Sequence, residues 1–102
     1  MNYLTRIADA ISNELPQELI PKDGAGDLML LYALLCVTVG QSVSANDVHD
    51  AWTTWMTGRG ERHTSMIPFD ELPADVQLED EPFASAIRRV AERFGLSGRR
   101  SE

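Results

Sequence analysis

The residues of this chain that could do chemistry gather near its middle. Trp52 and Trp55 stand three residues apart, and Arg59, Arg62 and His63 follow them. Indole rings can stack on a planar base, and guanidinium groups donate paired hydrogen bonds to phosphate oxygens. Residues three apart on a helix share a face. This stretch therefore predicts a binding site for an anionic ligand that carries an aromatic ring.

Each of these residues also has a purely structural interpretation. Trp52 and Trp55 share their helical spacing with Val48 and Met56, which is typical of a core face. Arginines of an acidic chain can instead form surface ion pairs, which contribute little to stability. His63 can donate to a ligand or can bond the backbone of the irregular segment that it opens. The sequence leaves both interpretations open.

Motifs that would indicate an enzyme are missing from the sequence. It has no HExxH pair, no phosphate-binding glycine loop followed by Lys-Ser or Lys-Thr, no GxSxG elbow and no Cys/His set for zinc. His49 and Asp50 are neighbours, but adjacent helical residues point in different directions, so we expect both on a solvated face. We therefore expect no catalytic residue, no cofactor and no metal site.

The composition is that of one globular domain with an acidic body. Of its 102 residues, 43% are hydrophobic and 25% charged, and the net charge is −7. Fourteen of the 16 acidic residues precede Pro82, whereas five of the nine basic residues follow it. Affinity for nucleic acid comes mainly from Lys and Arg that neutralise phosphates. We therefore expect no nucleic-acid polymer as partner.

The chain carries no sign of export or membrane insertion. Its single cysteine, Cys36, lies inside an apolar run and is expected to be a small buried hydrophobe in a reducing compartment. No cationic segment followed by an apolar stretch opens the chain. The longest apolar run, Leu28 to Val39, has 12 residues, too few to span a bilayer. A cytoplasmic protein without a membrane partner is predicted.

Helical periodicity predicts the first two helices. Apolar residues recur at helical spacing from Tyr3 to Leu15. A second helix is expected from Asp27 to Val39, with Asp27 as its N-cap and Gly40 ending it. This helix is apolar nearly all round, and three amphipathic neighbours would leave part of it uncovered. We therefore expect self-association as a two-fold homodimer.

Two further helices complete an all-α fold of four main helices. Ser44 is expected to open the third, with Asp47 completing a capping box. The fourth should begin at Asp80 or Glu81, since Pro82 fits a first helical turn, and should end at Gly95. We expect a single domain over residues 1–96 and a disordered tail over residues 97–102.

The connection from Gly58 to Glu79 is long and is expected to be ordered, with a short helix near residues 73–78. Its central stretch, HTSMIPFDELP, has apolar residues at neither helical nor strand spacing. Met66, Ile67, Phe69 and Leu72 are expected to point inward and fix the loop. On this interpretation, Phe69→Ala would cost about 3–5 kcal/mol through a core cavity.

Residues 52–81 carry a more specific pattern. A tryptophan and a glycine precede His-x-x-Met-x-Pro-Phe-x-x-Leu-Pro, and an aspartate follows. This pattern resembles the repeat domain of ryanodine receptors, which also occurs as a small module in bacteria and phages. The matching residues are Trp55, Gly58, His63, Met66, Pro68, Phe69, Leu72, Pro73 and Asp80. The chain has Thr64, Phe69, Gln77 and Glu81 where the family pattern has proline, tyrosine, lysine and arginine.

The resemblance implies a role in signalling. In prokaryotes, modules of this type have been proposed to sense nucleotide-derived signals in defence and regulation, and the whole chain resembles small proteins of actinobacteria and their phages. We therefore expect a non-enzymatic module that senses an anionic, nucleotide-like small molecule, or sequesters it if the protein is phage-borne. The alternative is a protein-interaction or structural domain that uses its acidic surface or its apolar helix. The predicted ligand-binding residues are Trp52, Trp55, Arg59, Arg62, His63 and Phe69.

Overall fold

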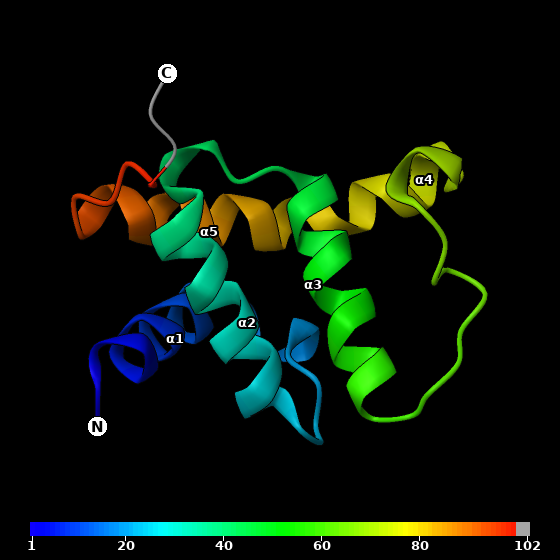
Figure 1. Ribbon diagram of the computed structural model, residues 1–102, viewed down its shortest axis with the longest axis horizontal. Helices are drawn as coiled ribbons and strands as arrows, with labels where there is room; N and C mark the ends of the chain where they lie inside the picture. The colour runs from blue at the N-terminus through cyan, green and yellow to red at the C-terminus, as the bar shows by residue number, and fades with distance from the viewer. Residues whose placement is uncertain (100–102) are drawn as a thin grey trace.

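A computed structural model describes residues 1–99 and contains α-helices joined by 3₁₀ turns (Figure 1). No strand occurs within that range, so the predicted all-α fold with four main helices is confirmed. A fifth, single-turn helix lies inside the long connection, close to where a short helix was expected. The helices are α1 Tyr3–Glu14, α2 Ala25–Thr38, α3 Ala45–Gly58, α4 Ala74–Gln77 and α5 Glu81–Arg93. The 3₁₀ turns are Gln17–Leu19, Gly40–Ser42, Phe69–Glu71 and Leu78–Asp80.

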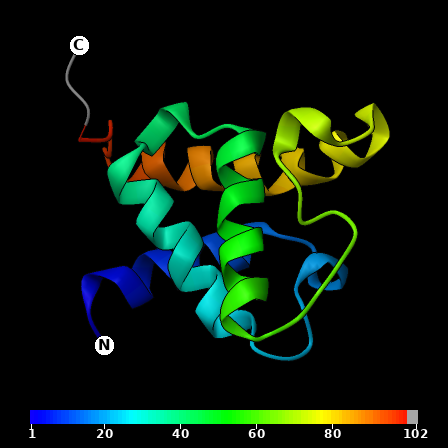
Figure 2. The same cartoon turned by 45° about the vertical axis from the view of Figure 1, so that its right-hand side comes forward.

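Helices α2 and α5 hold the bundle together. Each contacts the other, and both contact α1 and α3. Figures 1 and 2 show α5 crossing behind α2 and α3, with α1 beside α2. Side chains from all four helices fill the centre, which explains how a chain this short encloses a core without a disulfide. Residues that are at most 2% exposed include Ile11, Tyr32, Cys36, Val48, Ile87 and Val90.

The helix ends follow the sequence at most positions. The capping box predicted for α3 is present: Asp47 N–H donates to Ser44 Oγ at 3.3 Å, and Ser44 N–H donates to Asp47 Oδ2 at 2.9 Å. The prediction that Asp27 caps α2 is wrong. Gly24 takes that position with φ 74°, and α2 starts at Ala25. A left-handed residue favours glycine, so the preceding turn closes earlier and Asp27 falls in the first helical turn.

The Asp80 carboxyl group at the start of α5 is not used to cap the helix. Asp80 occupies the N-cap position as predicted, and Pro82 lies in the first turn. The Asp80 side chain, however, makes no capping hydrogen bond to the helix. It is directed toward α3 instead, where its Oδ2 lies 3.7 Å from His49 Nδ1.

The connection between α3 and α5 is packed, but not in the way its apolar residues suggest. Leu72 is buried, and Met66 and Phe69 are half-buried, whereas Ile67 is 39% exposed. The prediction that all four point inward is therefore wrong for Ile67. Its backbone carbonyl turns inward instead and accepts a hydrogen bond from His49 Nε2 at 2.7 Å. A polar bond thus fixes the loop where an apolar anchor was expected.

The last described residues return to the end of α2. Arg99 N–H donates to the Thr38 carbonyl at 2.9 Å. A Cβ atom on Gly40 would lie 2.5 Å from the backbone nitrogen of Gly98, so the two glycines allow a close approach of two backbones. Of the tail predicted to be disordered, residues 97–99 take part in this contact, and residues 100–102 lie outside the described range. Within residues 1–99, no helix is both long and apolar enough to cross a membrane.

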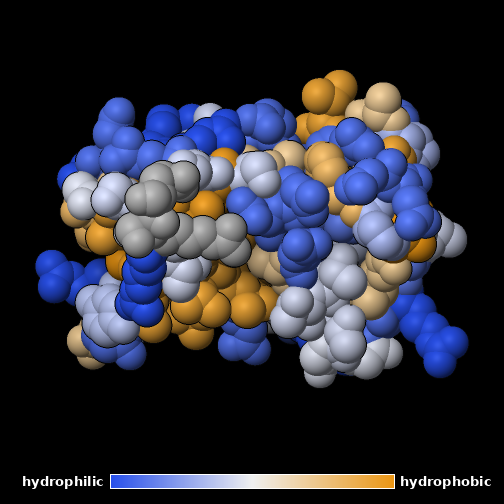
Figure 3. Space-filling view, turned by 45° about the horizontal axis from the view of Figure 1, so that its top comes forward, coloured by the Kyte–Doolittle hydropathy of each residue, from blue (hydrophilic) through white to orange (hydrophobic). Residues whose placement is uncertain are grey.

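Hydrophobic residues are exposed in more than one place on the surface. Figure 3 shows one group of them at the lower left and another at the upper right. On α2, Leu30 and Leu34 are 39% and 48% exposed. Residues four apart share a face of a helix. Leu28, Tyr32 and Cys36 are buried on the opposite side of α2, which packs into the core. The expectation that the neighbouring helices leave part of α2 uncovered is met at these two leucines.

Candidate functional site

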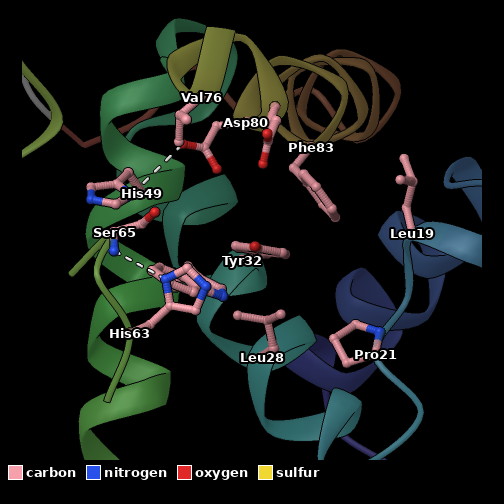
Figure 4. Close-up of a pocket in the computed structure, with 12 residues that line it drawn as sticks. Leu19, Pro21, Leu28, Tyr32, His49, His63, Ser65, Val76, Asp80 and Phe83 are labelled. Carbon is pink, nitrogen blue, oxygen red and sulfur yellow. Dashed lines mark hydrogen bonds and ion pairs between the residues drawn. The ribbon is translucent and has the colours of Figure 1, made fainter. Parts of the chain in front are cut away.

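A cleft of about 230 Å³ opens between α2, α3 and the start of α5 (Figure 4). Figure 4 shows Tyr32 at its centre, with Leu28 on one side and Asp80 and Phe83 on the other. The turn after α1 closes one side, and the loop after α3 closes another. Apolar residues that line the cleft are Leu19, Pro21, Leu28, Trp52, Val76 and Phe83. Polar residues that line it are Tyr32, His49, His63, Ser65, Glu79 and Asp80.

Tyr32 and Asp80 bring a hydroxyl and a carboxyl group to these walls. Tyr32 is 2% exposed, and its ring centroid lies 5.8 Å from that of Phe83. Burial, together with the charge of Asp80, raises the pKa of Tyr32, so its hydroxyl keeps its proton. Burial also raises the pKa of Asp80 to about 6, although His49 opposes this shift. The cleft therefore offers a hydroxyl and a carboxyl group in apolar surroundings.

His49 joins α3 to both the loop and α5. Its Nε2–H donates a hydrogen bond to the Ile67 carbonyl. In the neutral ring Nδ1 therefore has no proton, and only the imidazolium form presents an N–H to Asp80. The ring stacks on Trp52 with centroids 5.7 Å apart. Because His49 is 3% exposed, the prediction that it lies on a solvated face is wrong, whereas Asp50 is exposed as expected. The spacing of His49 to Trp52 and Met56 is helical, and it could have placed the histidine on the buried face.

His63 takes the structural role that the sequence allowed, and it also lines the cleft. Its Nδ1 accepts a hydrogen bond from Ser65 N–H at 3.0 Å, which shapes the loop. Its ring meets the Trp52 indole edge-on, with centroids 5.5 Å apart and an angle of 84°. His63 is exposed and also lines the cleft. It therefore holds the loop in place and remains available to a ligand at the rim.

Trp55 and Arg59 lie outside the cleft and form a separate cluster. Trp55 Nε1–H donates to the Gly24 carbonyl at 3.1 Å, and the Arg59 guanidinium lies 4.6 Å from the centroid of the Trp55 ring. Arg59 also pairs with Asp23 at 3.2 Å and with Glu61 at 3.4 Å. These contacts join the end of α3 to the turn before α2. They engage both side chains within the protein.

The structure thus brings together only part of the predicted site. Trp52 and His63 line the cleft, and Arg62 is an exposed residue next to His63. Phe69 lies outside the cleft, against the His49 ring at a centroid distance of 6.1 Å. The site residues that the sequence did not single out are Tyr32, His49, Asp80 and Phe83. Tyr32 was hidden in an apolar run, and Asp80 was assigned to a helix cap.

The chemistry of the cleft favours a ligand that donates hydrogen bonds. Among the described residues that line it, none is a lysine or an arginine. A carboxylate inside would repel a phosphate group but would accept hydrogen bonds from amino or ring N–H groups. In residues 1–99 no group of three His, Cys, Asp or Glu side chains could hold a metal ion. The arrangement therefore suits a small planar group with N–H donors.

The raised pKa of Asp80 predicts a measurable pH dependence of stability. The folded protein holds this proton more tightly than the unfolded chain, so the stability that Asp80 contributes is present below about pH 4 and is lost as the pH rises through about 6. The free energy of unfolding of the wild type should therefore fall relative to that of Asp80→Asn over this range. Urea titrations of both proteins at several pH values would measure the difference. If the free energy of unfolding of the wild type minus that of Asp80→Asn stays constant, or rises with pH, the assignment is wrong.

Comparison with known proteins gives a family but no activity. A family model described as a domain of unknown function (DUF7701) matches residues 2–92. No curated protein and no solved structure matches the chain. The matched range includes every residue that lines the cleft.

Proposed function

The chain belongs to the DUF7701 family, whose model covers nearly all of it, and from the geometry of its cleft we propose a non-enzymatic module that binds a nucleotide-derived signal. One observation carries this proposal. Tyr32 and Asp80 bring a hydroxyl and a carboxyl group to one cleft, whose lining also includes the aromatic side chains of Trp52 and Phe83. Ligand sites typically combine apolar and aromatic walls with a few convergent polar groups.

The size of the cleft decides which part of the ligand it takes. At about 230 Å³ it lies below the roughly 300–1,000 Å³ that is usual for drug-sized ligands. A cleft of this size suits a nucleobase better than a whole nucleotide. Asp80 would accept hydrogen bonds from an exocyclic amino group or a ring N–H, and Tyr32 would donate to a base oxygen or nitrogen. The aromatic walls would pack against the faces of the base.

The anionic part of such a ligand would stay outside the cleft. Arg62 and His63 are both exposed where the loop leaves α3, and His63 reaches the rim. A phosphate there would gain charge-assisted hydrogen bonds without facing Asp80. The resemblance of residues 52–81 to the ryanodine-receptor repeat supports a nucleotide-like ligand. Binding would act as sensing in a bacterial protein and as sequestration in a phage-borne one.

A thermal-shift screen against bases, nucleosides, nucleotides and cyclic nucleotides tests the proposal. A ligand at about a hundred times its dissociation constant stabilises the fold by roughly 2.7 kcal/mol. Asp80→Asn and Tyr32→Phe should each weaken binding at least about tenfold, because each removes a hydrogen-bonding group that the ligand would use in the cleft. Arg62→Ala should weaken binding of the phosphorylated ligand but not of its nucleoside.

Arg59→Ala is the matched control, since that guanidinium already pairs with Asp23 and Glu61. It should bind with wild-type affinity. The proposal is rejected if no compound of these classes raises the melting temperature. It is also rejected if Asp80→Asn and Tyr32→Phe both retain wild-type affinity for a compound that does.

A protein-interaction domain is the second candidate function. The observation that favours it is the pair of exposed leucines, Leu30 and Leu34, on the outer side of α2. Leu28 and Tyr32, which line the cleft, lie on the buried side of the same helix. The two functions therefore use different faces of α2 and can be tested separately.

A further inference from the structure

Four residues form a stripe along the outer face of α2. Asp27, Leu30, Leu34 and Thr38 follow one another at spacings of three or four residues, so they share a face. Asp27 is exposed, and the two leucines are 39% and 48% exposed. This face of the helix is hydrophobic at its middle and polar at both ends.

The two ends of the stripe have opposite charge. At the start of α2, Asp27 lies with Asp9 along a groove between α1 and α2. At the other end, the hydrogen bond from Arg99 N–H to the Thr38 carbonyl places Arg99, whose side chain is exposed, beside the last turn of α2. The stripe therefore runs from acidic through hydrophobic to basic.

We propose that this stripe is a homodimer interface, with a second copy of the chain packing its α2 antiparallel against the first. The midpoint between Asp27 and Thr38 falls between Tyr32 and Ala33, and Leu30 and Leu34 lie on either side of it. A two-fold axis at this midpoint sets the acidic end of one copy against the basic end of the other. In a two-fold interface the same patch meets itself, so an acidic, hydrophobic, basic order complements itself only in this antiparallel arrangement.

The surface beside the stripe can enlarge the contact. A 14-residue helix is about 21 Å long, and a stable interface takes about 800 Å² from each partner, more than two leucines supply. Tyr3 and Phe94 are 60% and 43% exposed and line a groove at the basic end, together with Val37 and Leu96. Hydrophobic surface thus continues from α2 onto α1 and the end of α5. Antiparallel pairing would cover part of it, and we expect a dissociation constant in the roughly micromolar range.

Sedimentation velocity from low to high micromolar protein tests the interface. Wild type should shift from monomer to dimer mass. Leu34→Glu should stay monomeric, because it places two carboxylates in the middle of the contact. Leu78→Glu is the matched control: Leu78 is 71% exposed in the turn after α4, and its replacement should leave the dimer unchanged. Circular dichroism of each variant checks that the fold is kept.

Charge variants test the antiparallel register. Asp27→Arg and Arg99→Asp should each weaken dimerisation roughly threefold to tenfold, since each turns attraction between exposed charges into repulsion. Mixing these two variants should restore association, because each copy then meets the opposite charge at both ends. A wild type that stays monomeric at high micromolar concentration overturns the proposal. So does a Leu78→Glu effect as large as that of Leu34→Glu, and so does a mixture that associates no better than either variant alone.

Discussion

Ile87→Ala is expected to lower the free energy of unfolding by about 2–5 kcal/mol, the largest effect we predict for one substitution. Ile87 is 0% exposed and lies in the middle of α5, the helix that contacts α1, α2 and α3. Its backbone carbonyl lies 3.8 Å from Cys36 Sγ on α2, so the two helices are close there. Truncation leaves a cavity that the surrounding helices can fill only partly. Urea denaturation followed by circular dichroism would measure the loss.

Phe69→Ala is the comparison that makes this result informative. The sequence suggested a loss of about 3–5 kcal/mol at Phe69. The structure shows a half-buried side chain on the loop, so removing it opens less cavity, and we expect a smaller loss than for Ile87→Ala. Equal losses for the two variants would mean that the loop belongs to the core as fully as α5 does.

His49→Phe is expected to cost about 1–3 kcal/mol and to loosen the loop that follows α3. Phenylalanine keeps a ring beside Trp52 but cannot donate to the Ile67 carbonyl, nor can it face Asp80 with a nitrogen. The loop thereby loses the hydrogen bond that takes the place of an inward-pointing Ile67 side chain. Denaturation gives the global loss, and hydrogen exchange or limited proteolysis of residues 63–68 reports the local one.

Asp50→Asn serves as the control for His49→Phe. Asp50 is the next residue of α3 and is exposed, so its replacement should change stability by no more than about 0.5 kcal/mol. If His49→Phe leaves both the stability and the protection of the loop at wild-type values, the bond to Ile67 does not hold the loop. Other contacts of the loop, such as the packing of His63 against Trp52, would then hold it in place.

The sequence predicted the helices well because their signals are local. Apolar spacing fixes which face of a helix is buried, and the Ser44 and Asp47 side chains bond backbone groups within one turn. Gly40 and Gly95 both have φ near 70° and lie just beyond the ends of α2 and α5, where the sequence placed the helix stops. Each of these features depends on residues at most a few positions apart.

The sequence failed where two local interpretations competed. Asp27 and Gly24 could each take the N-cap position of α2. The backbone there is left-handed, which glycine adopts readily, so Gly24 is the N-cap. Ile67 carries an apolar side chain, yet its carbonyl is the group that points inward. Loop conformation determines which group of a residue is buried, and nothing in the spacing of HTSMIPFDELP specifies that conformation.

The candidate site shows the same division. Trp52 and His63 could be selected from residue type and spacing, and both line the cleft. Trp55 and Arg59 were predicted from the same residue types and spacing, but they form a separate cluster outside the cleft. Trp52 and Trp55 share a face of α3 but lie about one turn apart along it, and the segments packed beside each turn determine what each side chain contacts.

By itself, the sequence determined an all-α chain, its helix boundaries to within two residues at most ends, and an apolar α2 that its neighbours do not fully cover. Only the tertiary structure placed Tyr32, His49 and Asp80 at one cleft, since they come from α2, α3 and the turn before α5, which are far apart in the chain. Helix formation depends on neighbours a few residues away, which the sequence shows directly. A cleft depends on how helices cross, and that is set by the packing of the whole core.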